Sequence, residues 1–450
     1  MWRKIIVSAL IIAILLIASC VYFSNPPSVD RPGITSDTSG GSIVIYEVYK
    51  ILRKHDFYVQ RIGPEGDFLW GEKGILIGSG YKNGGGIFTL HAVGDGSGGA
   101  IVIWRSHPQR EPLEYVNHAT RVDSEGNIQW RRDIPSIEEA IADGSGGVII
   151  TFSEFDERPC MLKIDSKGNF PWGKDGVSLS LCRYASCRDI ASDNLGGAII
   201  VQDIAGEDII SAQRVDSEGN ILWQRGGVQV FVGPAESPQV AGDGSGGALV
   251  AYMRNIPCED GIGSCGSDIY AQRVDAEGNI LWGSDGVPVR IGSPNPCSPK
   301  IVADGAGGAI IFFEENLSIY AQRLDPNGHK LWPEDAIQVW KGGGHSSPYY
   351  SVASDGFGGA IIQWCDGEES AERAQRLDAR GRKLWGLNGA LVSNTQGWHS
   401  PQAISEDSCG GAFISWIASK FIGDATSSYV QRIDAQGNRL WGEKGILLNG

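Results

Sequence analysis

The sequence predicts an all-β fold, a single eight-bladed β-propeller of four-stranded antiparallel blades. Two observations predict it. A turn signature, Asp-x-x-Gly-Gly followed by an apolar run, occurs eight times, and a hairpin signature that ends in Trp alternates with it eight times. A strict alternation with a period of about 50 residues indicates one repeat array rather than two or three ordinary domains.

The first signature supplies the turn between the first and second strands of each repeat. Glycine adopts the positive φ angles that a tight hairpin requires, which accounts for much of the high glycine content, 63 of 450 residues. The apolar run that follows, as at residues 248–252, indicates a strand buried on both faces. The signature begins at Asp37, Asp95, Asp143, Asp193, Asp243, Asp304, Asp355 and Asp407.

A calcium loop is the alternative interpretation of this turn. Calcium takes about six to eight oxygen ligands, whereas the turn at residues 243–247 offers one carboxylate. We therefore predict no metal and no cofactor.

The second signature is best preserved at residues 270–282, Tyr-Ala-Gln-Arg-Val-Asp-Ala-Glu-Gly-Asn-Ile-Leu-Trp. It predicts a third strand at 269–274, a turn at 275–278 and a fourth strand at 279–282. The trailing segment 286–289 either extends that strand or crosses to the next blade. Each Trp is predicted to fill the gap between neighbouring blades, and these residues are Trp70, Trp130, Trp172, Trp223, Trp282, Trp332, Trp385 and Trp441.

Four antiparallel strands per repeat, with no helical pattern, favour a propeller blade over a solenoid coil, which needs only about 20 to 30 residues. Ring closure is predicted to use residues 446–448 against the first blade. A basic residue precedes each second turn, and we predict that it pairs with a turn Asp, because alternation places Arg273 and Asp275 on one face of their strand. The basic residues are Arg61, Arg121, Lys163, Arg214, Arg273, Arg323, Arg376 and Arg432.

The Trp-ended hairpin resembles that of the quinoprotein-like eight-bladed propellers, in which an Asp, a turn Gly and a Trp recur once per blade. Asp275, Gly278 and Trp282 match those positions, in a turn that is one residue shorter. The Asp-box hairpin of sialidase-type propellers is a looser likeness with different spacing. The resemblance covers residues 34–450 at the level of fold, implies docking of neighbouring blades, and carries over no cofactor or catalytic residue.

Residues 1–23 are predicted to be a signal or an anchor. A short basic end precedes an apolar run, and Ile17-Ala18-Ser19-Cys20 resembles a bacterial lipobox, in which Cys20 would be lipidated. An uncleaved anchor, since residues 5–23 could just span a bilayer, and a simple cleaved signal are the alternatives. Residues 24–33 are an extended tether. The protein is thus expected to be exported and membrane-anchored, at the cell envelope or surface.

Cysteine usage agrees with export, because closely spaced pairs suggest small disulfide-closed loops. Possible disulfides join Cys182 to Cys187 and Cys258 to Cys265. No pattern typical of a zinc site is present.

The net charge of −15 and pI near 5 argue against nucleic acid as a partner. The seven His residues show no metal-ligand spacing, and no Gly-x-Ser-x-Gly elbow occurs. We therefore predict no catalytic residue.

Function on a repeat scaffold usually lies where the repeats differ. The loops after the second strands and the crossings between blades vary, and they emerge on one face. Unusual aromatic and polar residues gather there in the last three blades and could bind a sugar or a protein. The candidate ligand-binding residues are Trp340, His345, Tyr349, Tyr350, Trp364, Asp366, Trp398 and His399.

The predicted function is therefore non-catalytic binding of a protein or glycan partner through these variable loops. An extracytoplasmic enzyme, either a glycosidase-like hydrolase or a quinoprotein-type oxidoreductase, is the first alternative. A passive structural component of an envelope assembly is the second.

Overall fold

The computed structural model describes residues 33–448, except 50–53, 82–89, 107–114, 154–158, 180–184, 205–206, 225, 258–263, 293–295, 335, 343–348, 367–370, 396–397 and 420–426. Within these residues no helix is long and apolar enough to cross a membrane. The predicted signal or anchor, with Cys20, and the tether as far as residue 32 lie outside the described residues.

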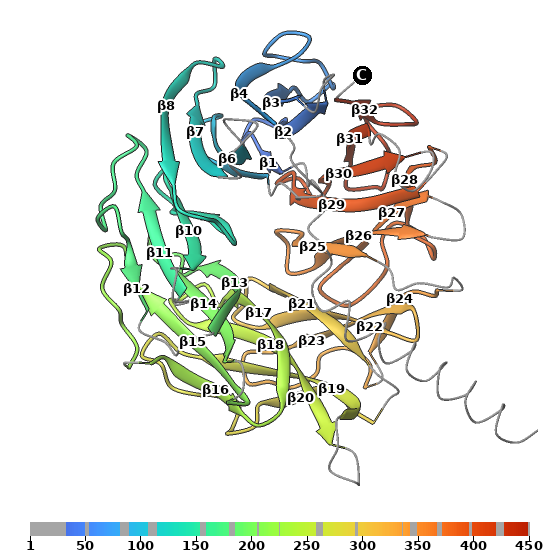
Figure 1. Cartoon of the computed structure of the whole chain (residues 1–450). Coiled ribbons are helices and arrows are strands. Elements are labelled where there is room, and N and C mark those ends of the chain that lie inside the picture. The colour runs from blue at the N-terminus through green and yellow to red at the C-terminus, as the bar shows by residue number, and fades with distance from the viewer. Residues whose placement is uncertain are drawn as a thin grey trace, which may run out of the picture.

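Eight four-stranded antiparallel sheets surround a common axis, so the chain is an eight-bladed β-propeller, as predicted (Figure 1). Each described sheet contains four consecutive strands, and the first strand of each blade is the innermost. Adjoining first strands contact one another around the whole ring, including β29 and β1.

Blade 1 contains β1 (Ile34–Ser36), β2 (Ser42–Tyr49), β3 (Lys54–Ile62) and β4 (Ile75–Tyr81). Blade 2 contains β5 (His91–Gly94), β6 (Ala100–Ser106), β7 (Val116–Val122) and β8 (Ile128–Ile134). Blade 3 contains β9 (Ala140–Ala142), β10 (Val148–Ser153), β11 (Pro159–Ile164) and β12 (Val177–Ser178). Blade 4 contains β13 (Ala185–Ser192), β14 (Ala198–Ile204), β15 (Ile209–Val215) and β16 (Val228–Val232).

Blade 5 contains β17 (Ala235–Gly242), β18 (Ala248–Pro257), β19 (Ser264–Val274) and β20 (Val287–Arg290). Blade 6 contains β21 (Cys297–Ala303), β22 (Ala309–Glu315), β23 (Ser318–Leu324) and β24 (Ile337–Trp340). Blade 7 contains β25 (Tyr350–Ser354), β26 (Ala360–Asp366), β27 (Ala371–Leu377) and β28 (Ala390–Ser393). Blade 8 contains β29 (Trp398–Glu406), β30 (Ala412–Ser419), β31 (Ser427–Ile433) and β32 (Ile446–Leu447).

The position of the fourth strand corrects one prediction. Residues 279–282 make only a single bridge, Val274 to Ile280, and the trailing segment β20 is the strand that pairs with β19. The buried Gln272 side chain explains why the fourth strand begins later than predicted. Its Oε1 accepts from the backbone N–H of Trp282 at 3.0 Å, and its Nε2 donates to the oxygen of Gly283. These backbone groups are therefore satisfied without a ladder. In blade 2, Thr120 stands at the position that corresponds to Gln272, and the fourth strand β8 includes Trp130.

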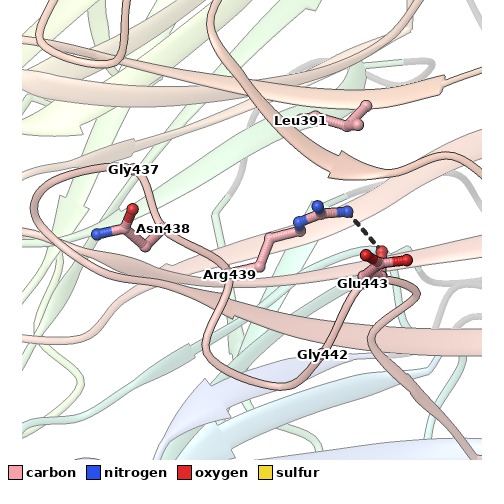
Figure 2. Close-up of a pocket in the computed structure, with 6 residues that line it drawn as sticks. All are labelled: Leu391, Gly437, Asn438, Arg439, Gly442 and Glu443. Atoms are coloured by element: carbon pink, nitrogen blue, oxygen red, sulfur yellow. Dashed lines mark hydrogen bonds between the residues drawn. The ribbon is translucent and has the colours of Figure 1, made fainter.

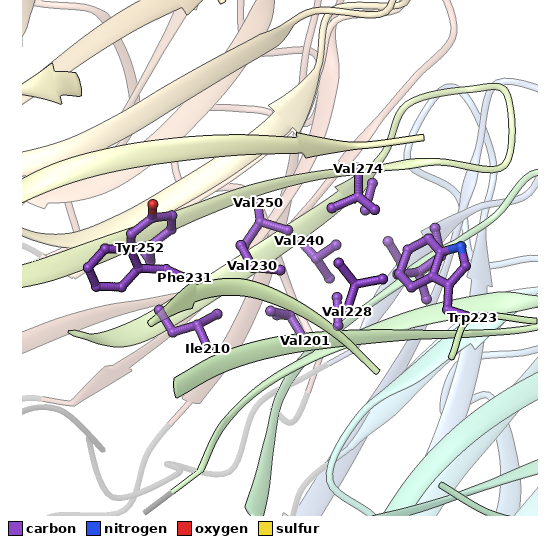
Figure 3. Close-up of a cluster of buried hydrophobic side chains, with 14 residues drawn as sticks. Val201, Ile210, Trp223, Val228, Val230, Phe231, Val240, Val250, Tyr252 and Val274 are labelled. Atoms are coloured by element: carbon purple, nitrogen blue, oxygen red, sulfur yellow. The ribbon is translucent and has the colours of Figure 1, made fainter. Parts of the chain in front are cut away.

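The apolar core lies in layers between neighbouring blades. Figure 3 shows the layer between blades 4 and 5, with Trp223 at one end and Phe231 and Tyr252 at the other. Valines from both blades fill the space between them, including Val201 and Val250. Burial of both faces of every blade is the main source of stability.

Side-chain packing closes the ring between blades 8 and 1. Phe413, Trp441 and Leu448 share one buried cluster with Ile34 and Val44 of the first blade. Of the predicted closing segment 446–448, β32 pairs with β31 in its own blade, and Leu448 packs in the cluster shared with blade 1.

The two ends of the ring differ in the way the repeats predict. Because the strands of a blade alternate in direction, the turns between first and second strands and those after third strands lie at one end, which we call the turn face. The links between second and third strands and the crossings between blades lie at the other end, which we call the loop face.

Candidate functional site

The eight hairpin Trp residues lie between neighbouring blades. Each indole N–H donates to a backbone carbonyl in the second turn of the next blade, as from Trp282 to Pro326 at 3.0 Å. The turn glycine packs on the ring: Gly278 has φ +88°, and a Cβ there would lie 2.9 Å from Cδ1 of Trp223. The other bonds join Trp70 to Ser124, Trp130 to Ser166, Trp172 to Ser217, Trp223 to Ala276, Trp332 to Ala379, Trp385 to Ala435 and Trp441 to Pro64.

The basic residue of each third strand pairs with the first-turn Asp of its own blade. Arg273 Nη2 lies 2.9 Å from Oδ2 of Asp243, and its Nη1 donates to the same Pro326 oxygen that accepts from the Trp. A turn Asp is thus the partner, but Asp275 is not, because its Oδ1 accepts from backbone N–H groups of its own turn. The other pairs are Arg61–Asp37, Arg121–Asp95, Lys163–Asp143, Arg214–Asp193, Arg323–Asp304, Arg376–Asp355 and Arg432–Asp407.

The first-turn carboxylates are occupied by the fold itself. In Asp243, Oδ1 accepts from the backbone N–H groups of Ser245 and Gly247, each at 2.8 Å. Burial alone would raise the pKa of Asp243, but the hydrogen bonds from Arg273, Ser245 and Gly247 outweigh it and lower the pKa. The repeated polar residues of the turn face therefore serve turns and blade docking.

Three of the predicted ligand-binding residues pack between blades 6 and 7. Trp364 is completely buried, and its ring lies 6.3 Å from that of the half-buried Trp340. Tyr350 belongs to the same cluster, and its hydroxyl donates to the carbonyl of Ser298. Trp364 and Tyr350 therefore offer no ring face to a surface ligand.

The other predicted residues have mixed surroundings. Asp366 is buried beside Arg373, with Nε and Oδ2 at 3.4 Å. His399 is buried, which lowers its pKa, and its Nε2 lies 3.0 Å from the hydroxyl of Thr395. Tyr349 is exposed. His345 and the side chain of Trp398, in β29, lie outside the described residues. Ligand binding by the eight predicted residues stays a prediction.

The cysteine pairs are only partly described. Cys187 carries a free thiol, so the structure contains no disulfide at this residue. Cys182 and Cys258, and the side chain of Cys265, lie outside the described residues, and the pairing of Cys258 with Cys265 stays a prediction.

One position at the innermost strands differs from blade to blade and is polar in six of the eight blades. Four residues before each first-turn Asp stand Gly33, His91, Glu139, Asp189, Gln239, Lys300, Ser351 and Ala403. Asp189 Oδ2 accepts from the backbone N–H of Val240 in the next blade at 2.8 Å, and Lys300 Nζ donates to Gln239 at 2.9 Å. Burial raises the pKa of Asp189 to about 7, and the charge of Glu139 also raises it. Asp189 can therefore exchange a proton near neutral pH.

A second irregularity lies beside these carboxylates. In seven blades an aromatic side chain stands five residues after the second Gly of the Asp-x-x-Gly-Gly turn. These residues are Tyr46, Trp104, Phe152, Tyr252, Phe313, Trp364 and Trp416. Blade 4 carries Gln202 there, opposite Ser211 on β15. Gln202 is completely buried, its Nε2 donates to the Ser211 hydroxyl at 2.9 Å, and its Oε1 has no partner.

Gln202 belongs to a polar group between blades 3 and 4, which we call the blade 3/4 site. Cys187 is its cross-strand neighbour on β13. Burial, and then the charge of Glu138, raise the pKa of the Cys187 thiol well above its usual range, and Thr151 hydrogen-bonds to it. Glu138 accepts from the Ser153 hydroxyl through Oε1, while its Oε2 has no partner. The site therefore offers acceptor oxygens and a protonated thiol that is a poor nucleophile.

These residues belong to no motif, so no motif in the sequence points to them. Gln202 and Asp189 stand at fixed distances from Gly197 and Asp193, so comparing the eight repeats position by position would have found them. Their meeting with Glu138 across two blades depends on the closed ring.

A shallow pocket at the rim has a different character. Figure 2 shows it between Leu391 of blade 7 and the last hairpin of blade 8, where the guanidinium of Arg439 donates to the backbone oxygen of Glu443 at 2.7 Å. Gly437 and Asn438 on its wall belong to the repeated turn. Its walls are therefore largely residues that recur in other blades.

Comparisons with known proteins find similarity only to solved structures. No family model and no curated protein matches the chain. The chain is similar to the BP39L lectin from Burkholderia pseudomallei, with 11% identity, a TM-score of 0.46, and coverage of 93% of this chain and 99% of the lectin.

The structures of two peptidases are also similar to this chain. For prolyl oligopeptidase B from Galerina marginata, identity is 9%, the TM-score 0.48, and coverage 91% of this chain and 56% of the enzyme. For the β-propeller domain of the Trilobed protease from Pyrococcus furiosus, identity is 9%, the TM-score 0.43, and coverage 80% and 97%. At these identities the likeness concerns the fold alone.

Proposed function

We propose that this protein is exported, is held at a membrane by its N-terminal segment, and binds a partner protein without catalysis through the loop face. The observation that carries the proposal is a set of exposed apolar side chains at strand ends on that face. Val232 at the end of β16 is 62% exposed, Ile256 in β18 39% and Ile291 after β20 53%. Water-exposed apolar side chains that gather on one face are typical of a protein interface.

The aliphatic character of this set favours a protein over a glycan. Sugar rings stack on aromatic faces, whereas Val232, Ile256 and Ile291 have none. Tyr115 and Tyr349 add exposed aromatic rings on the same face, at 40% and 42% exposure. The first-turn Asp, the basic residue and the hairpin Trp are occupied within the fold and are therefore not part of the proposed interface.

Cross-linking in the native membrane tests the proposal, with Val232→Asp as the variant and Leu195→Asp as its control. Leu195 lies on the turn face and has the same exposed fraction, 62%. A buried charge at an interface costs several kcal/mol, so Val232→Asp should lose the cross-linked partner while Leu195→Asp keeps it.

Equal partner capture by the parent and Val232→Asp contradicts the proposed surface. Mass spectrometry of the same preparation tests the anchor: a lipidated Cys20 at the mature N-terminus is expected, and an unmodified Met1 contradicts lipidation.

A further inference from the structure

We propose that the blade 3/4 site binds the ammonium group of an organic cation. The site lies near the innermost strands and is separate from the exposed apolar surface of the proposed function. Its two described acceptors without a partner are Oε1 of Gln202 and Oε2 of Glu138.

The replacement of an aromatic residue makes the site. In the other blades the corresponding side chain packs between blades, as Tyr252 does in the layer between blades 4 and 5. Gln202 is smaller, polar and completely buried. Its cross-strand neighbour Cys187 has Glu138 and Thr151 beside its thiol. A buried acceptor without a donor destabilises the folded chain, and a ligand that donates hydrogen bonds would remove that cost.

The local charge favours a cation. Glu138, Glu139 and Asp189 all lie close enough to act on the Cys187 thiol. Burial raises the pKa of Glu138 and Asp189, and a bound cation would offset that cost of ionising them. Of the nearby basic groups, Arg188 is paired with Asp203 at 2.7 Å, and Lys300 donates to Gln239.

An ammonium group fits better than a metal ion. Among the described residues no three His, Cys, Asp or Glu side chains are arranged to hold a metal. A primary ammonium carries three hydrogen-bond donors and no acceptor, which suits oxygens that lack donors. Charge-assisted hydrogen bonds to a carboxylate are about twice as strong as neutral ones.

Titration of the full-length protein in detergent micelles with n-butylammonium chloride tests the proposal, with 1-butanol as the neutral probe. A pH of about 8 lies above the pKa of Asp189, about 7, and below that of an alkylamine, about 10.4. The parent should bind butylammonium and not butanol.

Two variants and one control locate the site. Gln202→Tyr restores the aromatic residue of the other blades, and Glu138→Gln removes the charge but keeps the bond from Ser153. Each should weaken binding by about tenfold or more. Glu236→Gln, on the innermost strand β17, removes the same charge elsewhere and should bind like the parent.

The proposal is overturned if the parent does not bind butylammonium, if butanol binds equally, or if both site variants bind like the parent. Loss of binding in Glu236→Gln to the same extent also contradicts it, because attraction would then be general. Partner capture that depends on Val232 is measured separately, so either proposal can fail alone.

Discussion

At the scale of single residues, unusual groups lie where a repeated apolar position is replaced. Gln202 is one case, and Glu372 on β27 is another. Glu372 is completely buried, and neither of its carboxyl oxygens has a partner. Burial raises the pKa of Glu372 well above its usual range, and burial and Glu372 together raise the pKa of Cys365 to about 12.

Glu372→Met should stabilise the protein at neutral pH by about 1–3 kcal/mol, the cost of an unsatisfied buried polar group. In the unfolded chain Glu loses its proton above about pH 4.3, whereas in the folded chain Glu372 keeps it. The stability of the parent therefore falls as pH rises above that value until the raised pKa is reached, and the variant does not share the fall. Denaturant unfolding between pH 4 and 8 measures the difference.

Glu277→Met, at an exposed turn carboxylate, is the control and should show no such pH-dependent gain. If the parent gained stability relative to Glu372→Met as pH rises, the buried neutral carboxyl would be disproved.

At the scale of elements, one buried Gln shapes the end of a blade. The Gln272 side chain bonds to the backbone of Arg273, Trp282 and Gly283. It therefore holds the Trp hairpin in a turn and delays the fourth strand until β20. The same arrangement occurs with Gln60, Gln322, Gln375 and Gln431.

Gln272→Leu should destabilise the protein by about 2 kcal/mol, because the variant leaves the N–H of Trp282 and the oxygen of Gly283 without partners. Thermal unfolding measures the change. Gln338→Leu, at an exposed position of β24, should change stability by less than about 0.5 kcal/mol. Equal stability of Gln272→Leu and the parent would show that packing of the Trp alone holds the hairpin.

At the scale of the whole molecule, the ring is closed between blades 8 and 1, which no chain segment connects directly. Seven pairs of neighbouring blades are joined by a crossing, but blades 8 and 1 are held by packing and by the bond from Trp441 to Pro64 at 3.1 Å. The free energy of local opening is low where few contacts hold two elements together. The seam between blades 8 and 1 should therefore open first.

Trp441→Phe and Trp282→Phe each remove one interblade hydrogen bond, and each should cost about 1 kcal/mol. We expect only Trp441→Phe to speed hydrogen exchange in β1, β2 and β31. Blades 8 and 1 are not joined by a chain segment, so loss of one hydrogen bond opens this seam more easily than the other blade interfaces. Exchange followed by mass spectrometry measures this. The same change in these strands for Trp282→Phe would contradict a weak seam.

The eight blades, the turns and the docking role of Trp could be predicted from the amino-acid sequence, because these features depend on local signatures that recur at a fixed period. The sequence also placed the variable loops on one face, since strand direction alternates. It could not place the fourth strand, which depends on a side chain of Gln272 reaching eleven residues ahead to Gly283.

Which irregular residues meet could not be predicted from the sequence, because it depends on the packing of the blades. Trp364 and Tyr350 looked like surface residues because they border loops, yet they pack between two blades. Gln202, Cys187 and Glu138 looked unrelated because they lie in different segments of two repeats, yet they converge between blades 3 and 4. Contacts between blades join positions about 50 residues apart in a repeat array, and which side chains face one another there is set by the register of the sheets and the closure of the ring.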